Sequence, residues 1–216
     1  MTSRTTPSRM ADRFIDTGLE ALRALVALAP VAHVAFVEGA QPFVLPVAVA
    51  VTDDGLLLHG STGSRWLTLI GRGIPVSIGI TAVDGLVVAR SAFESSMHYR
   101  SAVLFGRCEP ITDDEKIAAL DLLTDTLIPG RVAEVRRPTS KELAGTLVLR
   151  CSVAEWTLKT SDGWPDDPEE DVAADSWAGV LPARTHYRDA LPAPDLRPDI
   201  DLPPSVKNLL RPGAAR

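Results

Sequence analysis

A series of short apolar runs, rich in β-branched residues and separated by tight turns, constrains this chain most. The runs extend from Val31 to Leu158, and Asp-Gly turns at Asp53-Asp54-Gly55 and Val83-Asp84-Gly85 join two pairs of them. Such turns between strand-like segments are typical of β-hairpins. Because few helices separate the runs, we predict a mainly β barrel or sandwich with flanking helices rather than a doubly wound α/β sheet.

Three helices are predicted beside these strands. An amphipathic pattern over residues 11–29 ends at a proline, and Ser64 is a plausible N-cap for a short helix over residues 65–72. The residues Thr-Asp-Asp-Glu at 112–115 match the capping-box pattern that opens a helix, which we expect to continue to about Leu127.

The composition changes near residue 160. Residues 161–202 contain 11 of the 28 acidic residues and only 3 basic ones, whereas residues 1–160 contain 17 acidic and 16 basic residues. We therefore expect an N-terminal lead and helix (1–29), a barrel domain (30–160) and an acidic, proline-rich C-terminal arm (161–216). Four apolar side chains of the arm can anchor it to the barrel or to another subunit: Trp164, Trp177, Leu181 and Tyr187.

Charge and cysteine content exclude several classes of protein. A net charge of −6 and a pI of about 5.2 give no electrostatic reason to bind nucleic acid or an anionic membrane. Prolines and charged residues interrupt the longest apolar stretches, so no membrane span is expected. Two cysteines, Cys108 and Cys151, suit a reducing compartment, and we expect a cytoplasmic protein in which each is a small strand residue. The four histidines are scattered, so no metal site is predicted.

The segment from Leu58 to Leu67 combines a strand end, a loop of small residues and a helix start. Backbone amides at a helix N-terminus, together with a hydroxyl at Ser64 and a guanidinium at Arg65, suit a phosphate group. An ordinary glycine-rich turn with a serine cap is the alternative. A second segment, His98 to Arg107, is a strand in which Arg100 and Ser101 face opposite sides. Arg100 there is either a ligand contact or a charge that protects a strand edge.

Taken together, these two segments resemble the pyridoxamine 5′-phosphate oxidase family of FMN-binding split barrels. The run FVLPVAVAVTDDGLLLHGSTGSRWL (43–67) resembles the flavin-binding hairpin of that family, and the pattern S-x-x-x-Y-R-S-A-V-x-x-G (95–106) is most similar to its nitroimidazole-resistance reductase branch. The resemblance covers residues 30–158. It implies a six- to seven-stranded antiparallel Greek-key split barrel and a homodimer with FMN at the interface.

The resemblance also implies roles for individual residues. It places Val44, Leu45, Pro46 and Val47 along the isoalloxazine, and His59 and Gly60 against the ring or the ribityl chain. Ser64 and Arg65 would hold the FMN phosphate, and Arg100 would lie near it. Ser101 would be a polar residue that reaches the ring from the opposite subunit. Trp66 belongs to this cofactor set, although the oxidase has a phosphate-binding lysine there, and Val49 replaces a substrate-facing lysine.

These departures argue against oxidation of pyridoxamine phosphate itself. We expect an FMN-dependent oxidoreductase in which the flavin passes electrons from a nicotinamide donor to a small acceptor, with no catalytic acid or base supplied by the chain. A non-catalytic carrier of flavin, deazaflavin or haem is an alternative, with His59, His98 or His186 as candidate haem ligands. A ligand-free scaffold whose acidic tail recruits a partner is another. Arg184-x-His186 resembles the oxidase's substrate-binding Arg-x-His, but it lies in the tail, and we attribute this match to chance.

Overall fold

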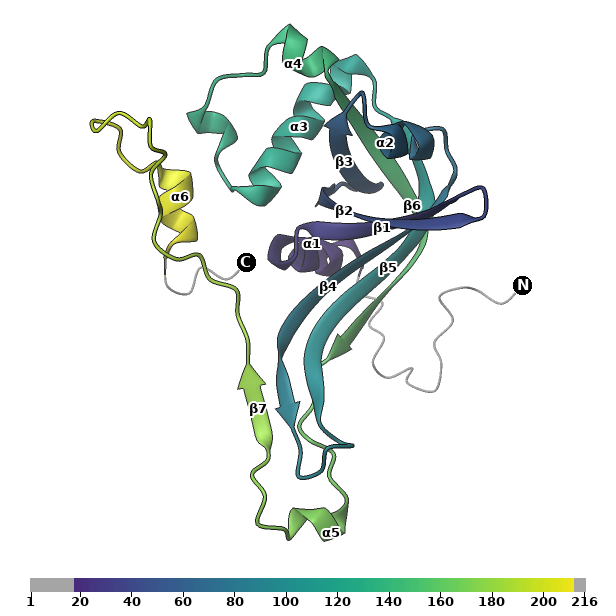
Figure 1. Cartoon of the computed structure of the whole chain (residues 1–216), viewed down its shortest axis with the longest axis vertical. Helices are drawn as coiled ribbons and strands as arrows, with labels where there is room; N and C mark the ends of the chain where they lie inside the picture. Colours follow the sequence, from purple (N-terminus) through teal and green to yellow (C-terminus); the bar gives the residue numbers. More distant parts are fainter. Residues whose placement is uncertain (1–17, 212–216) are drawn as a thin grey trace.

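Six antiparallel strands form a closed ring in a computed structural model, which describes residues 18–211 (Figure 1). The ring order is β1-β2-β3-β6-β5-β4, and β4 pairs back with β1. The strands are β1 (Val31–Glu38), β2 (Gln41–Val51), β3 (Gly55–Ser61), β4 (Pro75–Val88), β5 (Ser96–Pro110) and β6 (Thr146–Ser161). The predicted mainly β, antiparallel split barrel with flanking helices is therefore confirmed.

Alternating side chains fill the ring. On β5, Ala102 and Leu104 are buried, whereas Val103 between them is 38% exposed, as the two-residue period of a strand requires. The helix α1 (Gly18–Leu28) packs its buried face against the same core. That face consists of Leu22, Leu25 and Val26. The predicted start of this helix at residue 11 lies outside the described residues.

Two more helices cover the barrel. The short helix α2 (Arg65–Ile70) buries Leu67 and Ile70 in the main core. The longer helix α3 (Asp113–Leu127) covers the outer surface of β2, β3 and β6, where it closes a second apolar cluster. That cluster comprises Ala50, Leu57, Ile111, Ala119, Leu123 and Val148. The connection from α3 to β6 contains η2 (Val132–Glu134) and α4 (Ser140–Ala144).

The C-terminal arm runs away from the barrel and returns to it at a few points (Figure 1). It contains α5 (Glu169–Val172), β7 (Gly179–Pro182), which pairs with β4, and α6 (Pro204–Leu209). The four expected apolar anchors do not bury themselves against the chain's own barrel, because their exposed fractions run from 49% to 79%. Polar contacts hold the arm instead, such as the Arg90–Asp167 ion pair at 2.8 Å.

The turn predicted at Val83-Asp84-Gly85 does not exist. The residues on either side of it form one strand, β4, and the register with β5 shifts between Val83 and Gly85 as a β-bulge. A bulge inserts one residue without ending the strand. Gly85 is needed because β7 passes close to it: a Cβ there would lie 2.6 Å from the carbonyl oxygen of Leu181.

The two cysteines are also corrected. Cys108 and Cys151 are directly opposite each other on β5 and β6, both are buried, and they form a disulfide. They are not independent small strand residues. No spacing in the sequence indicates this contact, because the register of two strands 43 residues apart sets it.

The capping box likewise lies elsewhere than predicted. Thr112 is the N-cap residue of α3, but its side chain makes no capping hydrogen bond. The reciprocal pair of bonds occurs instead at α4, where the Thr139 hydroxyl accepts from the Glu142 backbone N–H and the Glu142 carboxylate accepts from the Thr139 backbone N–H. Among residues 18–211, no helix has the length and apolar character needed to cross a membrane.

Candidate functional site

The barrel is split between β2 and β3. Strand β2 pairs with β1 over residues 41–48, but it pairs with β3 only over residues 49–51. Beyond Leu58, β3 pairs with β6 alone. One edge of β2 therefore has no neighbouring strand, and the last residues of β3 diverge from it. The residues predicted to contact an isoalloxazine lie along this free edge, and His59 and Gly60 lie on the strand across the split.

The side chains of the four β2 residues at the split point alternately to solvent and to the barrel core. Val44 is 60% exposed and Pro46 is exposed, whereas Leu45 and Val47 pack against the barrel core. Only the first pair can offer side chains to a ligand outside the barrel. Leu45 and Val47 can contribute through their backbone groups, which lie along the unpaired edge.

His59 carries an unpartnered buried atom. Its Nδ1 is buried and has no hydrogen-bond partner among residues 18–211. Burial lowers the pKa of the imidazole below its ordinary value of 6.5, so the ring is neutral at pH 7. Buried polar atoms are nearly always hydrogen-bonded in native proteins. A bound group that donates to this nitrogen, or a metal ion that it coordinates, fits its environment.

The loop after β3 leads directly into α2. Ser64 occupies the N-cap position, but its side chain makes no capping hydrogen bond, so its hydroxyl is not committed to the helix. Arg65 is 80% exposed and its Nη2 lies 2.6 Å from a carboxylate oxygen of Glu38. Gly60 lets the helix approach, because a Cβ there would lie 3.2 Å from Cδ2 of Leu67. Trp66 is partly buried and packs against the core.

Arg100 and Ser101 lie far from this loop in the same chain. Arg65 contacts Glu38 at one end of β1, whereas Arg100 pairs with Ala82, beyond the other end of β1. Along the strand direction the positions of Arg65 and Arg100 are therefore eight residues apart, which corresponds to about 25 Å. One chain therefore brings together the predicted contacts on β2, β3 and α2, but it does not bring Arg100 and Ser101 to the loop that carries Ser64 and Arg65.

Arg100 is held in place by its own chain. Its Nε and Nη2 donate to the two carboxylate oxygens of Asp84, at 2.8 and 2.5 Å. These bonds raise the pKa of Arg100 further above its ordinary value, so the guanidinium is charged at every relevant pH. The bulge at residue 84 places this carboxylate opposite Arg100.

Arg100 lines a cavity of about 550 Å³ at the end of the barrel beside α1. The arm forms one wall, directly after β7. Its polar and apolar lining includes Leu28, Thr81, Asp84, Arg100, Arg184 and His186. From the sequence alone the Arg184-x-His186 match is attributed to chance, but the structure brings both residues to a cavity, because the arm folds back along β4.

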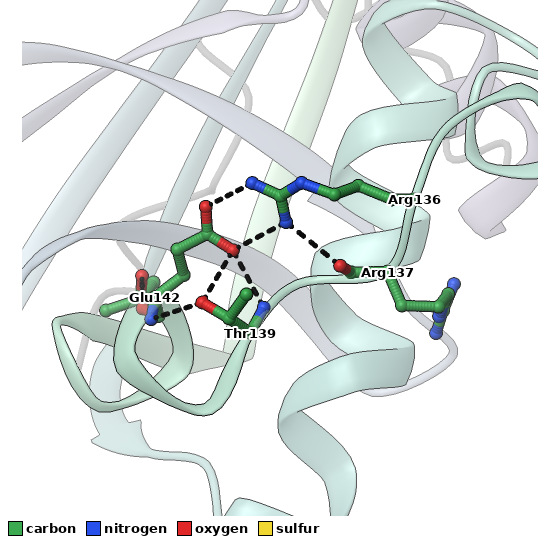
Figure 2. A network of polar contacts seen from close by, with 5 residues as sticks. Arg136, Arg137, Thr139 and Glu142 are labelled. Carbon is green, nitrogen blue, oxygen red and sulfur yellow. Dashed lines mark hydrogen bonds and ion pairs between the residues drawn. The ribbon is translucent and has the colours of Figure 1, made fainter.

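A second cavity of about 440 Å³ lies between α3 and the connection that follows it. Figure 2 shows its polar rim, where Arg136 donates to both oxygens of Glu142 at 2.9 and 2.6 Å. Arg137 is likewise paired, with Asp121. Together with Thr139, Arg136 lowers the pKa of Glu142 to about 2. Both arginines thus pair with carboxylates, so neither guanidinium is available to neutralise the charge of a bound ligand.

The split barrel with these segments defines the class of protein. Residues 19–160, more than half of the chain, match the family described as pyridoxamine 5′-phosphate oxidase. The chain belongs to that family. No curated protein matches the sequence.

Two solved structures are similar over nearly the whole chain. An FAD- and haem-binding protein of Mycobacterium smegmatis is 49% identical with a TM-score of 0.86, covering 90% of this chain and 96% of its own. The flavocytochrome Anf3 of Azotobacter vinelandii is 33% identical with a TM-score of 0.86, covering 95% and 96%. Both matches must include most of the arm, which the family match over residues 19–160 does not.

The nitroimidazole-resistance branch is more distant than predicted. A Bacteroides thetaiotaomicron structure described as a putative 5-nitroimidazole antibiotic resistance protein is 20% identical with a TM-score of 0.57, covering 68% of this chain and 86% of its own. That likeness is one of fold. The family prediction is therefore confirmed, and the finer assignment to this branch is corrected: the chain is more similar to the two structures above.

Proposed function

We propose that this protein is a flavin-dependent oxidoreductase whose flavin is FAD rather than the FMN predicted from the sequence. The observation that carries the proposal is the 49% identity, over 90% of the chain, to a protein named for binding FAD and haem. The 33% identity to a flavocytochrome supports a flavin cofactor, without indicating which flavin. The family assignment makes a flavin the expected cofactor.

The split between β2 and β3 is the proposed flavin seat. The free edge of β2 over Val44–Val47 supplies consecutive backbone groups along one side, as a flat ring system requires. Gly60 leaves space where the chain turns toward α2. The Ser64 hydroxyl and the exposed Arg65 guanidinium then hold a flavin phosphate, and Arg65 gives up its ion pair with Glu38 to do so.

A second copy of the chain completes this seat in the proposal. Ser101 lies about 25 Å from the loop of its own chain, on the strand face opposite to Arg100, and we propose that it reaches the ring from a partner subunit. Arg100 is bound to Asp84 and turned to the inner face of β5. We therefore assign the partner contact to Ser101, with Arg100 serving the separate cavity beside α1.

Bound flavin would supply hydride and electron transfer, and the chain's residues would bind and orient it. A nicotinamide donor and a small acceptor remain the proposed reactants. Oxidation of pyridoxamine phosphate is not proposed, because Val49 stands at the substrate-facing lysine position and is fully buried in the barrel core. Non-catalytic flavin or deazaflavin carriage is the alternative, which steady NADH or NADPH consumption with an added acceptor would rule out.

Haem is the second proposed cofactor, on the strength of the two similar structures. Of the three candidate ligands, His98 already uses its Nε2 in a 2.8 Å hydrogen bond to the carbonyl of Gly163. His186 is exposed on the arm, whereas His59 has a buried nitrogen without a partner among residues 18–211. We therefore place His59 first as the axial ligand, and a flavin contact is its alternative role.

The first experiment is an absorbance spectrum of the purified protein, followed by mass identification of the released cofactors. A flavin spectrum with FAD recovered, and a Soret band, are expected. In His59→Ala, loss of the Soret band alone assigns His59 to haem, and loss of flavin alone assigns it to the flavin. Retention of both would remove His59 from either site.

Arg65 tests the flavin seat directly. Arg65→Ala should weaken FAD binding by about 2 kcal/mol, roughly 30-fold, because a charge-assisted bond to phosphate is lost. Riboflavin, which lacks phosphate, should bind this variant and the wild type equally. Arg72→Ala, at the other end of α2, is the matched control and should bind FAD normally. Equal loss of FAD and riboflavin binding in Arg65→Ala would contradict the phosphate assignment.

A further inference from the structure

The cavity between α3 and the connection that follows it has polar ties along its edges. The Asp125 carboxylate accepts from the Val132 N–H at 3.0 Å, which fixes the start of the connection to α3. Farther along, both guanidinium groups of the rim pair with carboxylates through two hydrogen bonds each. The connection therefore has a defined path over α3, and the space beneath it is part of the folded structure.

The interior of this cavity is apolar. Its walls include Leu120 on α3, Val132 on η2, and Val135 and Pro138 on the following segment. Val135 is 42% exposed although it lies on the wall. The hydroxyl of Thr124 also lines the cavity, but it already donates to the carbonyl of Leu120 at 2.8 Å. A ligand that covers these walls with apolar surface gains free energy from burial.

The charged side chains that line the cavity cancel one another. Arg136 donates to both carboxylate oxygens of Glu142. Arg137 donates to both carboxylate oxygens of Asp121. The bonds from Arg136, followed by those from Thr139, lower the pKa of Glu142 to about 2, so this carboxylate is ionised at physiological pH. Among residues 18–211, every charged side chain of the lining is thus paired, and an ionic ligand would bring a charge without a partner.

The rim also presents two planar groups, the guanidiniums of Arg136 and Arg137 (Figure 2). A pair of parallel hydrogen bonds to a carboxylate fixes the orientation of a guanidinium plane. Such planes stack on the faces of aromatic rings. The cavity volume of about 440 Å³ lies within the range of small-molecule sites, so a compound of two fused rings has room in it.

We propose that this cavity binds an uncharged aromatic compound, whose ring packs against Leu120, Val132 and Val135 and stacks on the paired guanidiniums of the rim. The residues assigned to the flavin seat lie on β2, β3, β5 and at the start of α2, whereas α3 and the connection that follows it carry this site. The two sites share no residue, so this inference does not rest on the flavin proposal.

Calorimetric titration of the full-length protein at pH 7 tests this inference. The probe is naphthol, which is uncharged at this pH. Naphthoate is its anionic counterpart, and decalol has the same two fused rings without aromatic character. We expect naphthoate and decalol to bind about tenfold more weakly than naphthol. Equal binding of naphthoate contradicts the charge argument, equal binding of decalol contradicts aromatic stacking, and no binding of naphthol overturns the proposal.

Val135→Asp places a carboxylate on the apolar wall and should weaken naphthol binding by about tenfold or more. The matched control is Val172→Asp, because Val172 on α5 is similarly exposed, at 52%, and lies outside the cavity. This control should bind naphthol as the wild type does. Flavin content is recorded from the absorbance spectrum of each sample. An unchanged affinity in Val135→Asp would place naphthol elsewhere, such as on a bound flavin, and would overturn the proposal.

Arg137→Gln tests the role of charge without altering the apolar wall. It leaves Asp121 without its partner, so the cavity gains a negative charge. Binding of naphthylmethylammonium, a cationic probe, should then rise about fivefold over the wild type, and naphthol binding should not rise. No gain for the cation would show that the ion pairs do not set the selectivity. If a second copy of the chain covers the cavity instead, naphthol does not bind and Val135→Asp lowers the mass measured by light scattering, which also overturns the proposal.

Discussion

The barrel and the arm use opposite means to hold a chain in place. In the barrel, side chains such as Leu58 and Leu104 are completely buried, and each strand has paired neighbours. In the arm, Leu191 is 91% exposed and Trp164 is 79% exposed. Burial of apolar surface is the dominant favourable contribution to folding. The barrel therefore determines whether the protein folds, whereas polar contacts determine where the arm lies.

Several local attachments keep the arm beside the barrel. The Asp167 side chain is 1% exposed and pairs with Arg90, and β7 adds four residues to the edge of β4. At the start of α6, the N–H of Ser205 donates to Glu134 at 2.9 Å and its hydroxyl donates to the same carboxylate at 2.5 Å. Each attachment is local, so each can open without unfolding the barrel.

A core substitution gives the largest expected effect. Leu104→Ala should lower the free energy of unfolding by about 3 kcal/mol, because it leaves a cavity in the barrel core. Leu191→Ala makes the same chemical change in the arm and should leave that free energy nearly unchanged. Urea denaturation measures both. Equal effects of the two substitutions would erase the distinction between the regions.

Loss of an arm attachment should have a smaller and local effect. Arg90→Gln leaves the buried Asp167 carboxylate without its charged partner, at a cost of about 2 kcal/mol. We expect limited proteolysis to cut the arm faster, while the main unfolding transition keeps its midpoint. Arg188→Gln is the control and should be cut at the wild-type rate. A shifted midpoint in Arg90→Gln would mean that the arm folds as part of the barrel.

Acid should release α6 before the barrel unfolds. The hydrogen bonds from Ser205, followed by Arg131, lower the pKa of Glu134 below its ordinary value of 4.5. A lowered pKa in the folded state means that this link stabilises the protein above pH 4.5 and is lost as the pH falls below it. Hydrogen exchange of α6 at pH 6 and pH 3 should detect the release. In Ser205→Ala the change between these pH values should shrink, and an equal change would disprove the role of this link.

Removal of the arm should affect the barrel least. A chain that ends at Ser161 keeps all six strands of the ring, so we expect one cooperative unfolding transition, destabilised by about 1 kcal/mol or less. Circular dichroism with thermal denaturation measures this stability. Loss of the cooperative transition would show that the arm is part of the folding unit.

The sequence predicts the barrel well because its signals are local. The Asp-Gly turn at residues 53–55 joins β2 to β3 as expected, with the Thr52 N–H bonded to the Gly55 carbonyl. The two-residue period of β5 puts Arg100 and Ser101 on opposite faces as expected, but it does not show which face is the inner one. The same Asp-Gly signal at residues 84–85 predicts a turn wrongly, because β7 pairs with β4 at Gly85 and the strand continues through a bulge.

The candidate sites are only partly predictable. Val44–Val47, His59, Gly60, Ser64 and Arg65 converge on the split because short segments of neighbouring strands carry them. Asp84, Arg184 and His186 could not be placed, since their proximity depends on an arm that leaves the barrel and returns. The disulfide between Cys108 and Cys151 depends in the same way on the register of two distant strands.

The long strands β4, β5 and β6 continue beyond the ring as a projecting sheet (Figure 1). Such a sheet has two lateral edges, and an unprotected edge can pair with another chain and start aggregation. Strand β7 covers the edge formed by residues 85–88 of β4. The opposite edge, where β6 has passed the end of β3, carries the charged residues Glu155 and Lys159. The protein thus protects one edge with its own chain and the other with charge.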